Sequence, residues 1–73
     1  MLELLAQRLG CYISSLPAAQ WAALRYLREF PPRQFSMEEW SYCLGYIFRE
    51  RVRLEGYAEL EDYLVQKAAE LRK

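Results

Sequence analysis

The stretch Phe35–Gly56, FSMEEWSYCLGYIFRERVRLEG, decides the fold predicted for this chain, because it carries the signals of one long helix. Ser36 is a candidate N-cap residue, and Glu39 follows three positions later, as the glutamate of a capping box does. At the other end, Gly56 is the residue type that most often closes a helix. We therefore predict a helix over residues 36–55.

The apolar residues of this stretch recur at helical spacing, which predicts one broad buried face. Phe35, just before the N-cap, is placed to pack on Trp40 as a hydrophobic staple. Arg51 projects into the apolar face, where a buried arginine needs a carboxylate, and Glu55 is the local candidate. The alternative is that the face leaves the core beyond Phe48. The residues of the face are Met37, Trp40, Cys43, Leu44, Ile47, Phe48 and Val52.

The rest of the chain predicts three further helices around the long one. Leucine, alanine, glutamate and arginine dominate the composition, whereas β-branched residues are rare and threonine is absent. Apolar spacing, together with the stop at Pro31 and Pro32, sets the helix boundaries. For the 73 residues we expect an all-α, compact four-helix domain, a single helical domain over 1–73, with helices at about 2–15, 17–30, 36–55 and 57–72.

We make three further predictions for the first half of the chain. Gly10 lies inside the first predicted helix, and we interpret it as a place where another backbone comes close. Pro17 is expected in the first turn of the second helix, after an N-cap at Ser14 or Ser15. The residues of that helix expected to face the core are Trp21, Leu24, Leu27 and Phe30.

The side-chain chemistry argues against an enzyme. The chain has no histidine, so it cannot build a Ser-His-Asp or Cys-His arrangement. Cys11 and Cys43 are its two cysteines, too few for a structural zinc site in one chain. We interpret both as small buried hydrophobic residues, with an intramolecular disulfide or a zinc ion shared by two chains as alternatives. We predict no catalytic residue, no cofactor and no metal.

The start of the chain shows no targeting or membrane signal. After Met1 comes LELLAQRLG, in which Glu3 and Arg8 interrupt the apolar run. No stretch has the form of a signal peptide or approaches the length of a membrane span. We therefore expect a cytoplasmic protein with no membrane role.

The apolar content exceeds what so small a body can bury, and this excess predicts an interaction surface. Hydrophobic residues make up 53% of the chain and aromatic residues 15%, and small domains have much surface for their volume. On the side of the long helix opposite the core, tyrosine and arginine, the types that dominate binding hot spots, recur at helical spacing. A solvated helix face is the alternative. The predicted partner-binding residues are Tyr42, Tyr46, Arg49 and Arg53.

From these residues we predict a non-enzymatic protein-interaction module, an adaptor or regulator. Its partner is expected to be another protein chain, either a different protein or a second copy in a homodimer. Self-association is the form we favour, because it hides the surplus apolar surface.

A DNA-binding regulator is the alternative function. The run LPAAQWAALRYLREFPPRQFSMEEWSYCLG is similar to the start of the helix-turn-helix in winged-helix repressors of the MarR type, through Trp40, Ser41, Leu44 and Gly45. The resemblance covers less than half of the chain and implies a transcriptional regulator; Arg49, Arg51 and Arg53 offer phosphate contacts. Ten basic and ten acidic residues give a net charge of zero, without the basic footprint of a nucleic-acid-binding protein. We therefore rank nucleic acid second to a protein partner.

Overall fold

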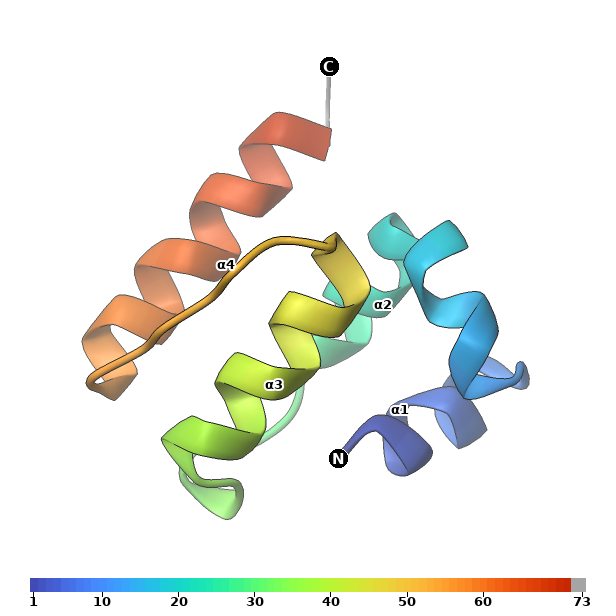
Figure 1. The fold of residues 1–73 in the computed structure, drawn as a ribbon, viewed down its shortest axis with the longest axis horizontal. Helices are drawn as coiled ribbons and strands as arrows, with labels where there is room; N and C mark the ends of the chain where they lie inside the picture. Colours follow the sequence, from blue (N-terminus) through green and yellow to red (C-terminus); the bar gives the residue numbers. More distant parts are fainter. Residues whose placement is uncertain (72–73) are drawn as a thin grey trace.

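The computed structural model describes residues 1–71, which form helices joined by short connections (Figure 1). The four α-helices are α1 (Leu2–Leu9), α2 (Gln20–Leu27), α3 (Met37–Phe48) and α4 (Tyr57–Leu71), and two short 3₁₀-helices are η1 (Ile13–Ala18) and η2 (Pro32–Gln34). No strand occurs within residues 1–71. The prediction of an all-α, four-helix fold is confirmed.

One core joins all four α-helices and η1. Helix α3 runs through the middle of the molecule, with α4 on one side and α1 and η1 on the other (Figure 1). Its apolar face is buried as predicted, and among the described residues no charged or polar residue is buried. The buried residues are Leu5, Ala6, Leu16, Ala23, Leu24, Leu27, Phe30, Trp40, Cys43, Leu44, Ile47, Phe48, Leu60, Leu64 and Ala68.

The predicted start of α3 is confirmed. The Glu39 amide donates to Ser36 Oγ at 3.1 Å, and the Ser36 amide donates to Glu39 Oε1 at 3.3 Å, which is a complete capping box. The rings of Phe35 and Trp40 meet edge to face with their centroids 6.0 Å apart, as the hydrophobic staple predicts. The indole N–H of Trp40 also donates to the carbonyl oxygen of Pro32 at 2.9 Å. These contacts fix both the start of α3 and the turn before it.

The predicted end of this helix is wrong. Helix α3 ends at Phe48, because Arg49 turns into the left-handed region with φ 55° and ψ 40°. Residues 49–56, which we call the connector, then run without helix to α4 (Figure 1). Gly56 lies at the start of α4, where its carbonyl oxygen accepts from the Leu60 amide at 3.2 Å.

The connector replaces the last two turns of the predicted helix and changes which side chains are buried. Val52 and Leu54 pack against the core, whereas Arg51, Arg53 and Glu55 are exposed. Arg51 therefore does not lie in an apolar helix face, and the described residues contain no ion pair between Arg51 and Glu55. The alternative, in which the face leaves the core beyond Phe48, is not observed either, because the helix itself ends there and Val52 and Leu54 stay packed against the core.

Small residues on α3 let the connector pass close to the helix. A Cβ atom added at Gly45 would lie 3.0 Å from the carbonyl oxygen of Glu50. One turn earlier, Ser41 Oγ accepts from the Leu54 amide at 3.1 Å. Gly45 is thus the place where a second backbone approaches a helix, the role that the sequence suggested for Gly10.

The predicted first helix is divided at Gly10, which ends α1 with φ 68°. The Gly10 amide donates to the Gln7 carbonyl, and the Cys11 amide donates to the Ala6 carbonyl, the pattern of a Schellman motif. Nothing lies within 4 Å of a Cβ atom added at Gly10, so the interpretation of a close backbone approach there is wrong. The left-handed backbone explains this glycine instead.

The start of the second predicted helix is also wrong. Pro17 lies in η1, and α2 begins at Gln20 with neither Ser14 nor Ser15 as its N-cap. Leu24, Leu27 and Phe30 are buried as predicted. Trp21 is 43% exposed, because it lies in the first turn of α2, at the end of the buried stripe.

Substitutions at the two residues with a left-handed backbone should change the stability of the protein in opposite directions. Gly10 and Arg49 have φ of 68° and 55°, and a residue with a Cβ atom is destabilised by roughly 1–2 kcal/mol in this region. We expect Gly10→Ala to lower the free energy of unfolding by about 1 kcal/mol. Arg49→Gly should raise the free energy of unfolding, by up to about 1 kcal/mol, after the added freedom of the unfolded chain is subtracted.

Urea unfolding followed by circular dichroism measures both changes. Gly56→Ala is the control, since Gly56 has no left-handed φ and no atom within 4 Å of an added Cβ. An Arg49→Gly variant less stable than the parent protein would contradict the assigned backbone conformation.

Candidate interaction surfaces

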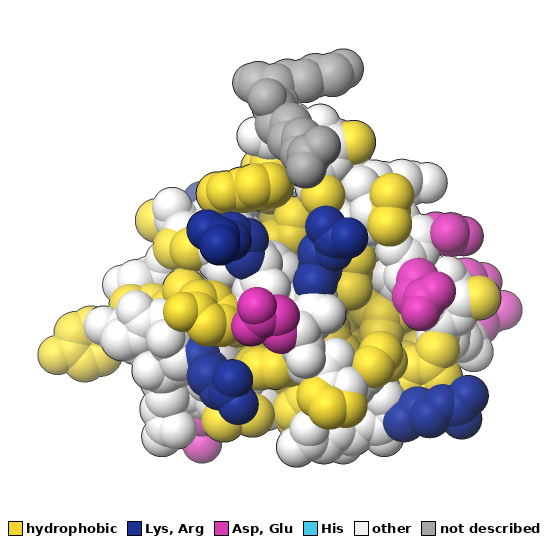
Figure 2. Space-filling model, turned by 180° about the vertical axis from the view of Figure 1, so that it is seen from behind, with side chains coloured by type: hydrophobic (Ala, Val, Ile, Leu, Met, Phe, Trp, Pro, Cys, Tyr) yellow, Lys and Arg dark blue, Asp and Glu magenta, His cyan; other side chains and the backbone are white. Residues whose placement is uncertain are grey.

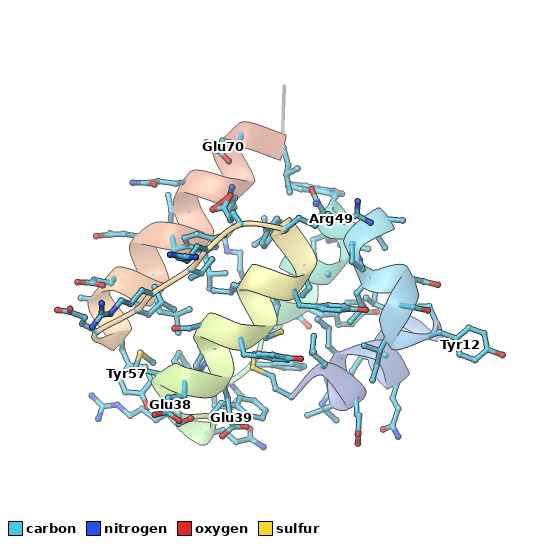
Figure 3. All side chains as sticks on the ribbon, in the orientation of Figure 1. Tyr12, Glu38, Glu39, Arg49, Tyr57 and Glu70 are labelled. Atoms are coloured by element: carbon cyan, nitrogen blue, oxygen red, sulfur yellow. The ribbon has the colours of Figure 1, made fainter. Side chains whose placement is uncertain are left out.

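The structure separates the four residues predicted to bind a partner. Tyr42 and Tyr46 both lie on α3, but Tyr42 is 70% exposed whereas Tyr46 is half-buried and packs against the core. Arg49 is exposed at the end of α3 (Figure 3), and Arg53 is exposed on the connector. The four do not form one helical row, because the helix that would align them ends at Phe48.

Tyr42 lines a shallow hollow where the first residues of the chain meet α3. The side chains around this hollow are those of Met1, Leu2, Glu3, Ile13, Glu39 and Tyr42. A neighbouring hollow shares Glu3 and Ile13 with it and is also lined by Tyr12. Tyr12 is 82% exposed and points away from the body of the molecule (Figure 3). We call Met1, Leu2, Glu3, Tyr12, Ile13, Glu39 and Tyr42 the tyrosine surface.

The turn after α1 creates this surface. Gly10 reverses the chain, and Tyr12 follows in an extended conformation with φ −81° and ψ 154°. Ile13 then begins η1 and packs against the core, while Tyr12 is left in solvent. Sequence reasoning missed Tyr12 because it placed this residue in the apolar stripe of a helix over 2–15. Gly10 was the signal in the sequence: a helix that ends at Gly10 places Tyr12 in the turn that follows, outside any buried helical face.

The tyrosine surface is acidic as well as aromatic. Glu3 and Glu39 are exposed, and the ion pairs found among residues 1–71 involve neither of them. Arg8, also on α1, stacks its guanidinium over the Phe30 ring at 5.6 Å. Two carboxylates therefore flank an apolar centre at Ile13.

A second apolar surface lies between α2 and α4. Two adjoining hollows share Arg28 and Val65, and we call them together the α2–α4 groove. Val65 is 59% exposed. Apolar side chains are visible between basic ones on this face, and acidic side chains gather along the edge that α4 forms (Figure 2). The groove is lined by Leu27, Arg28, Phe30, Pro32, Trp40, Leu60, Glu61, Leu64, Val65, Ala68 and Ala69.

A cluster around Lys67 ties the connector to α4. Lys67 Nζ lies 2.7 Å from Glu50 Oε1 and 3.1 Å from Glu70 Oε2, and the Tyr63 hydroxyl donates to Glu50 Oε2 at 3.0 Å. The ammonium also lies 5.3 Å from the centre of the Phe48 ring and 5.6 Å from that of Tyr63. We call these five residues the Lys67 clasp. All polar groups of the clasp pair with one another, which indicates a structural role.

The clasp shifts the ionisation of its members. The hydrogen bond from Lys67 lowers the pKa of the Glu50 carboxyl below its ordinary value. Burial raises the pKa of the Tyr63 phenol, and its hydrogen bond to Glu50 raises it further. For Lys67, burial opposes the charge, but the bonds to Glu50 and Glu70 outweigh burial and raise its pKa.

The two cysteines are free thiols in different surroundings. Cys43 is buried on α3 as predicted, and burial raises its pKa to about 12, so it stays protonated at neutral pH. Cys11 is half-buried in the turn after α1, and not on a helix as predicted. Residues 1–71 contain no group of three or more side chains able to hold a metal ion. In the same part of the chain, every helix is too short or too polar to cross a membrane.

We found no match to this chain among models of known protein families, curated proteins or solved structures.

Proposed function

We propose that this protein is a non-enzymatic interaction module that binds another protein through the tyrosine surface. The observation that supports the proposal is the exposure of Tyr12 and Tyr42, at 82% and 70%, around two hollows that meet at Ile13. Tyrosine offers a large apolar area with a polar tip and is enriched in binding hot spots. Because these two side chains are so exposed, their contribution to the stability of the fold is small.

The charges of the surface indicate the chemistry of the partner. We expect an apolar anchor to contact Ile13, which lines both hollows, and Glu3 and Glu39 favour basic groups next to that anchor. We therefore propose a partner segment in which an aromatic or aliphatic side chain is flanked by lysine or arginine. A shallow surface of this size suits a short segment and reversible binding, as in an adaptor or regulator.

Selection from a random peptide display library tests the proposal directly, because the library samples many candidate segments at once. We expect peptides enriched on the parent protein to combine an apolar anchor with lysine or arginine. The Tyr12→Ala/Tyr42→Ala variant should bind the selected peptides at least tenfold more weakly, since hot-spot truncations are each worth about 1 kcal/mol or more. Fluorescence titration measures the dissociation constants, and circular dichroism should show unchanged helicity.

Val65→Ala is the matched control, because it removes an exposed apolar side chain from the α2–α4 groove and leaves the tyrosine surface intact. Failure to enrich any peptide would count against the proposal. So would selected peptides that bind the double tyrosine variant as tightly as the parent protein.

DNA binding is the second candidate, and one observation favours it. Arg49, Arg51 and Arg53 are all exposed in the connector. Arg49 lies in the left-handed turn, whereas Arg51 and Arg53 lie in the extended part, where residues two apart are spaced by roughly 6.5 Å. Such a row suits backbone phosphates rather than base edges. The resemblance to a helix-turn-helix does not support this candidate, because Trp40 and Gly45 lie within the single helix α3 and the connector follows where a recognition helix is expected. An absence of gel retardation at low salt would remove this candidate.

A further inference from the structure

The α2–α4 groove leaves an apolar stripe of α4 without a partner in one copy of the chain. Glu61, Val65 and Ala69 follow one another at intervals of four residues, so they share one side of the helix. All three are exposed and border the groove. Beneath them, Leu64 and Ala68 form part of its floor. The small side chains of Ala68 and Ala69 allow another helix to approach closely.

The groove also carries two opposite charges that are not paired with each other. Arg28, the C-cap residue of α2, and Glu61 on α4 both line it, yet the ion pairs in the described part of the chain all involve Lys67. Arg28 borders both hollows, and in the second of them it lies with Val65, Ala68 and Ala69. One side of the groove is thus basic and the other acidic. A surface of this kind is complementary to itself after a half-turn.

From this arrangement we propose that a second copy of the chain occupies the α2–α4 groove in a two-fold dimer centred on Val65. Glu61 and Ala69 each lie four residues from Val65, about 6 Å along the helix axis. When two α4 helices pack antiparallel with Val65 at the axis, Glu61 of one copy therefore faces Ala69 of the other. Because Ala69 shares a hollow with Arg28, that glutamate meets the arginine of the other copy, and the symmetry creates two such pairs.

This dimer goes beyond the proposed function because it uses a different surface. The α2–α4 groove and the tyrosine surface have no residue in common, so dimerisation leaves both tyrosine surfaces available. A dimer then presents two copies of the binding surface, and a partner with two matching segments gains affinity by avidity.

Charge reversal tests the dimer, with the mass in solution measured over a range of concentrations by sedimentation equilibrium. For the parent protein we expect a shift from one to two copies of the 8.7 kDa chain as concentration rises. Arg28→Glu and Glu61→Arg should each raise the dissociation constant of the dimer at least tenfold, because each change makes the charges at positions 28 and 61 alike at both symmetric contacts. The double variant Arg28→Glu/Glu61→Arg should have a dissociation constant within about threefold of that of the parent protein.

Matched controls carry the same change of charge outside the groove. Arg51→Glu, on the connector, and Asp62→Arg, beside Glu61 on α4, should leave the dissociation constant unchanged, because neither residue lines the groove. Val65→Arg, which places a charge at the proposed axis, should leave a monomer with unchanged helicity.

The outcomes separate this inference from the proposed function. A monomer at every concentration would overturn it, as would a dimer that the double charge swap fails to rescue. A dimer abolished by Tyr42→Ala would place the second copy on the tyrosine surface and also overturn it. Binding of the selected peptides by the monomeric Val65→Arg variant would show that the proposed function stands independently of dimerisation.

Discussion

Trp40→Ala should lower the free energy of unfolding by about 3–5 kcal/mol, the usual range for a buried tryptophan truncated to alanine. Trp40 is the largest fully buried side chain, with no exposed area. Its removal leaves a cavity at the junction of α2, α3 and α4 that rigid neighbours cannot fill, and it removes the hydrogen bond to the Pro32 carbonyl. A domain of this size has about 4–11 kcal/mol of stability in total, so the variant loses from about a quarter to all of it.

Urea unfolding at 25 °C, followed by circular dichroism at 222 nm, measures this loss. Trp40→Phe is the informative companion, because it keeps most of the ring volume and loses the hydrogen bond; we expect it to lose roughly 1–3 kcal/mol. Trp21→Ala is the control, since this second tryptophan is 43% exposed and should lose less than Trp40. A Trp40→Ala protein with the parental urea midpoint would show that Trp40 does not hold the three helices together.

The parts of the fold that could be predicted from the sequence are those specified by local signals. The capping box of Ser36 and Glu39 is a contact between near neighbours, and it appears in the structure as expected. The buried face of α3 follows directly from the spacing of its apolar residues. The burial of Leu60, Leu64 and Ala68 on α4 follows in the same way.

The prediction of the end of α3 was wrong because two periodicities occur in the same residues. In RERVRLE, residues 49–55, an alternation of charged and apolar residues is superimposed on the helical pattern, and alternation indicates an extended chain. Val52 and Leu54 are half-buried against the core on one side of the connector while Arg51 and Arg53 are exposed on the other, as this second pattern requires. Contacts distant in the sequence favour the extended form, above all the hydrogen bond from the Leu54 amide to Ser41 Oγ and the bonds of Glu50 with Tyr63 and Lys67. A single sequence does not reveal such contacts.

The candidate site was predicted only in part for the same reason. Tyr42 lies in the first half of α3, just after the capping box that marks the start of the helix, and its exposure was predicted. Arg53 was assigned to the same row, but the connector carries it off the helix. Ile13 comes beside Tyr42, and Tyr12 beside Ile13, through a turn at Gly10 and the packing of η1 on α3, which no local sequence pattern predicts.

Removal of the Lys67 charge should also lower the free energy of unfolding, because the clasp is the main polar link between the connector and α4. Lys67→Met keeps an apolar stem on the rings of Phe48 and Tyr63 and removes both ion pairs. We expect a loss of about 1–2 kcal/mol in the free energy of unfolding. The value stays modest because the side chains of Glu50 and Glu70 are 42% and 63% exposed, which weakens each pair. Glu70→Gln, which removes the more exposed partner alone, should lose less than about 0.5 kcal/mol.

The pH dependence distinguishes the ion pair of this clasp from its ring contacts. The folded protein lowers the pKa of Glu50 below 4.5, so the stabilisation it provides is complete above pH 4.5 and is lost as pH falls through the lowered pKa. It raises the pKa of Lys67 above 10.5, so that contribution is complete below pH 10.5 and is lost as pH rises through the raised pKa. The difference in urea midpoint between the parent protein and Lys67→Met should therefore be constant from about pH 5.5 to 9.5 and shrink on both sides. A difference that persists unchanged at pH 2.5 would mean that Lys67 acts through the contact of its ammonium with the rings of Phe48 and Tyr63, with no net contribution from its ion pair with Glu50.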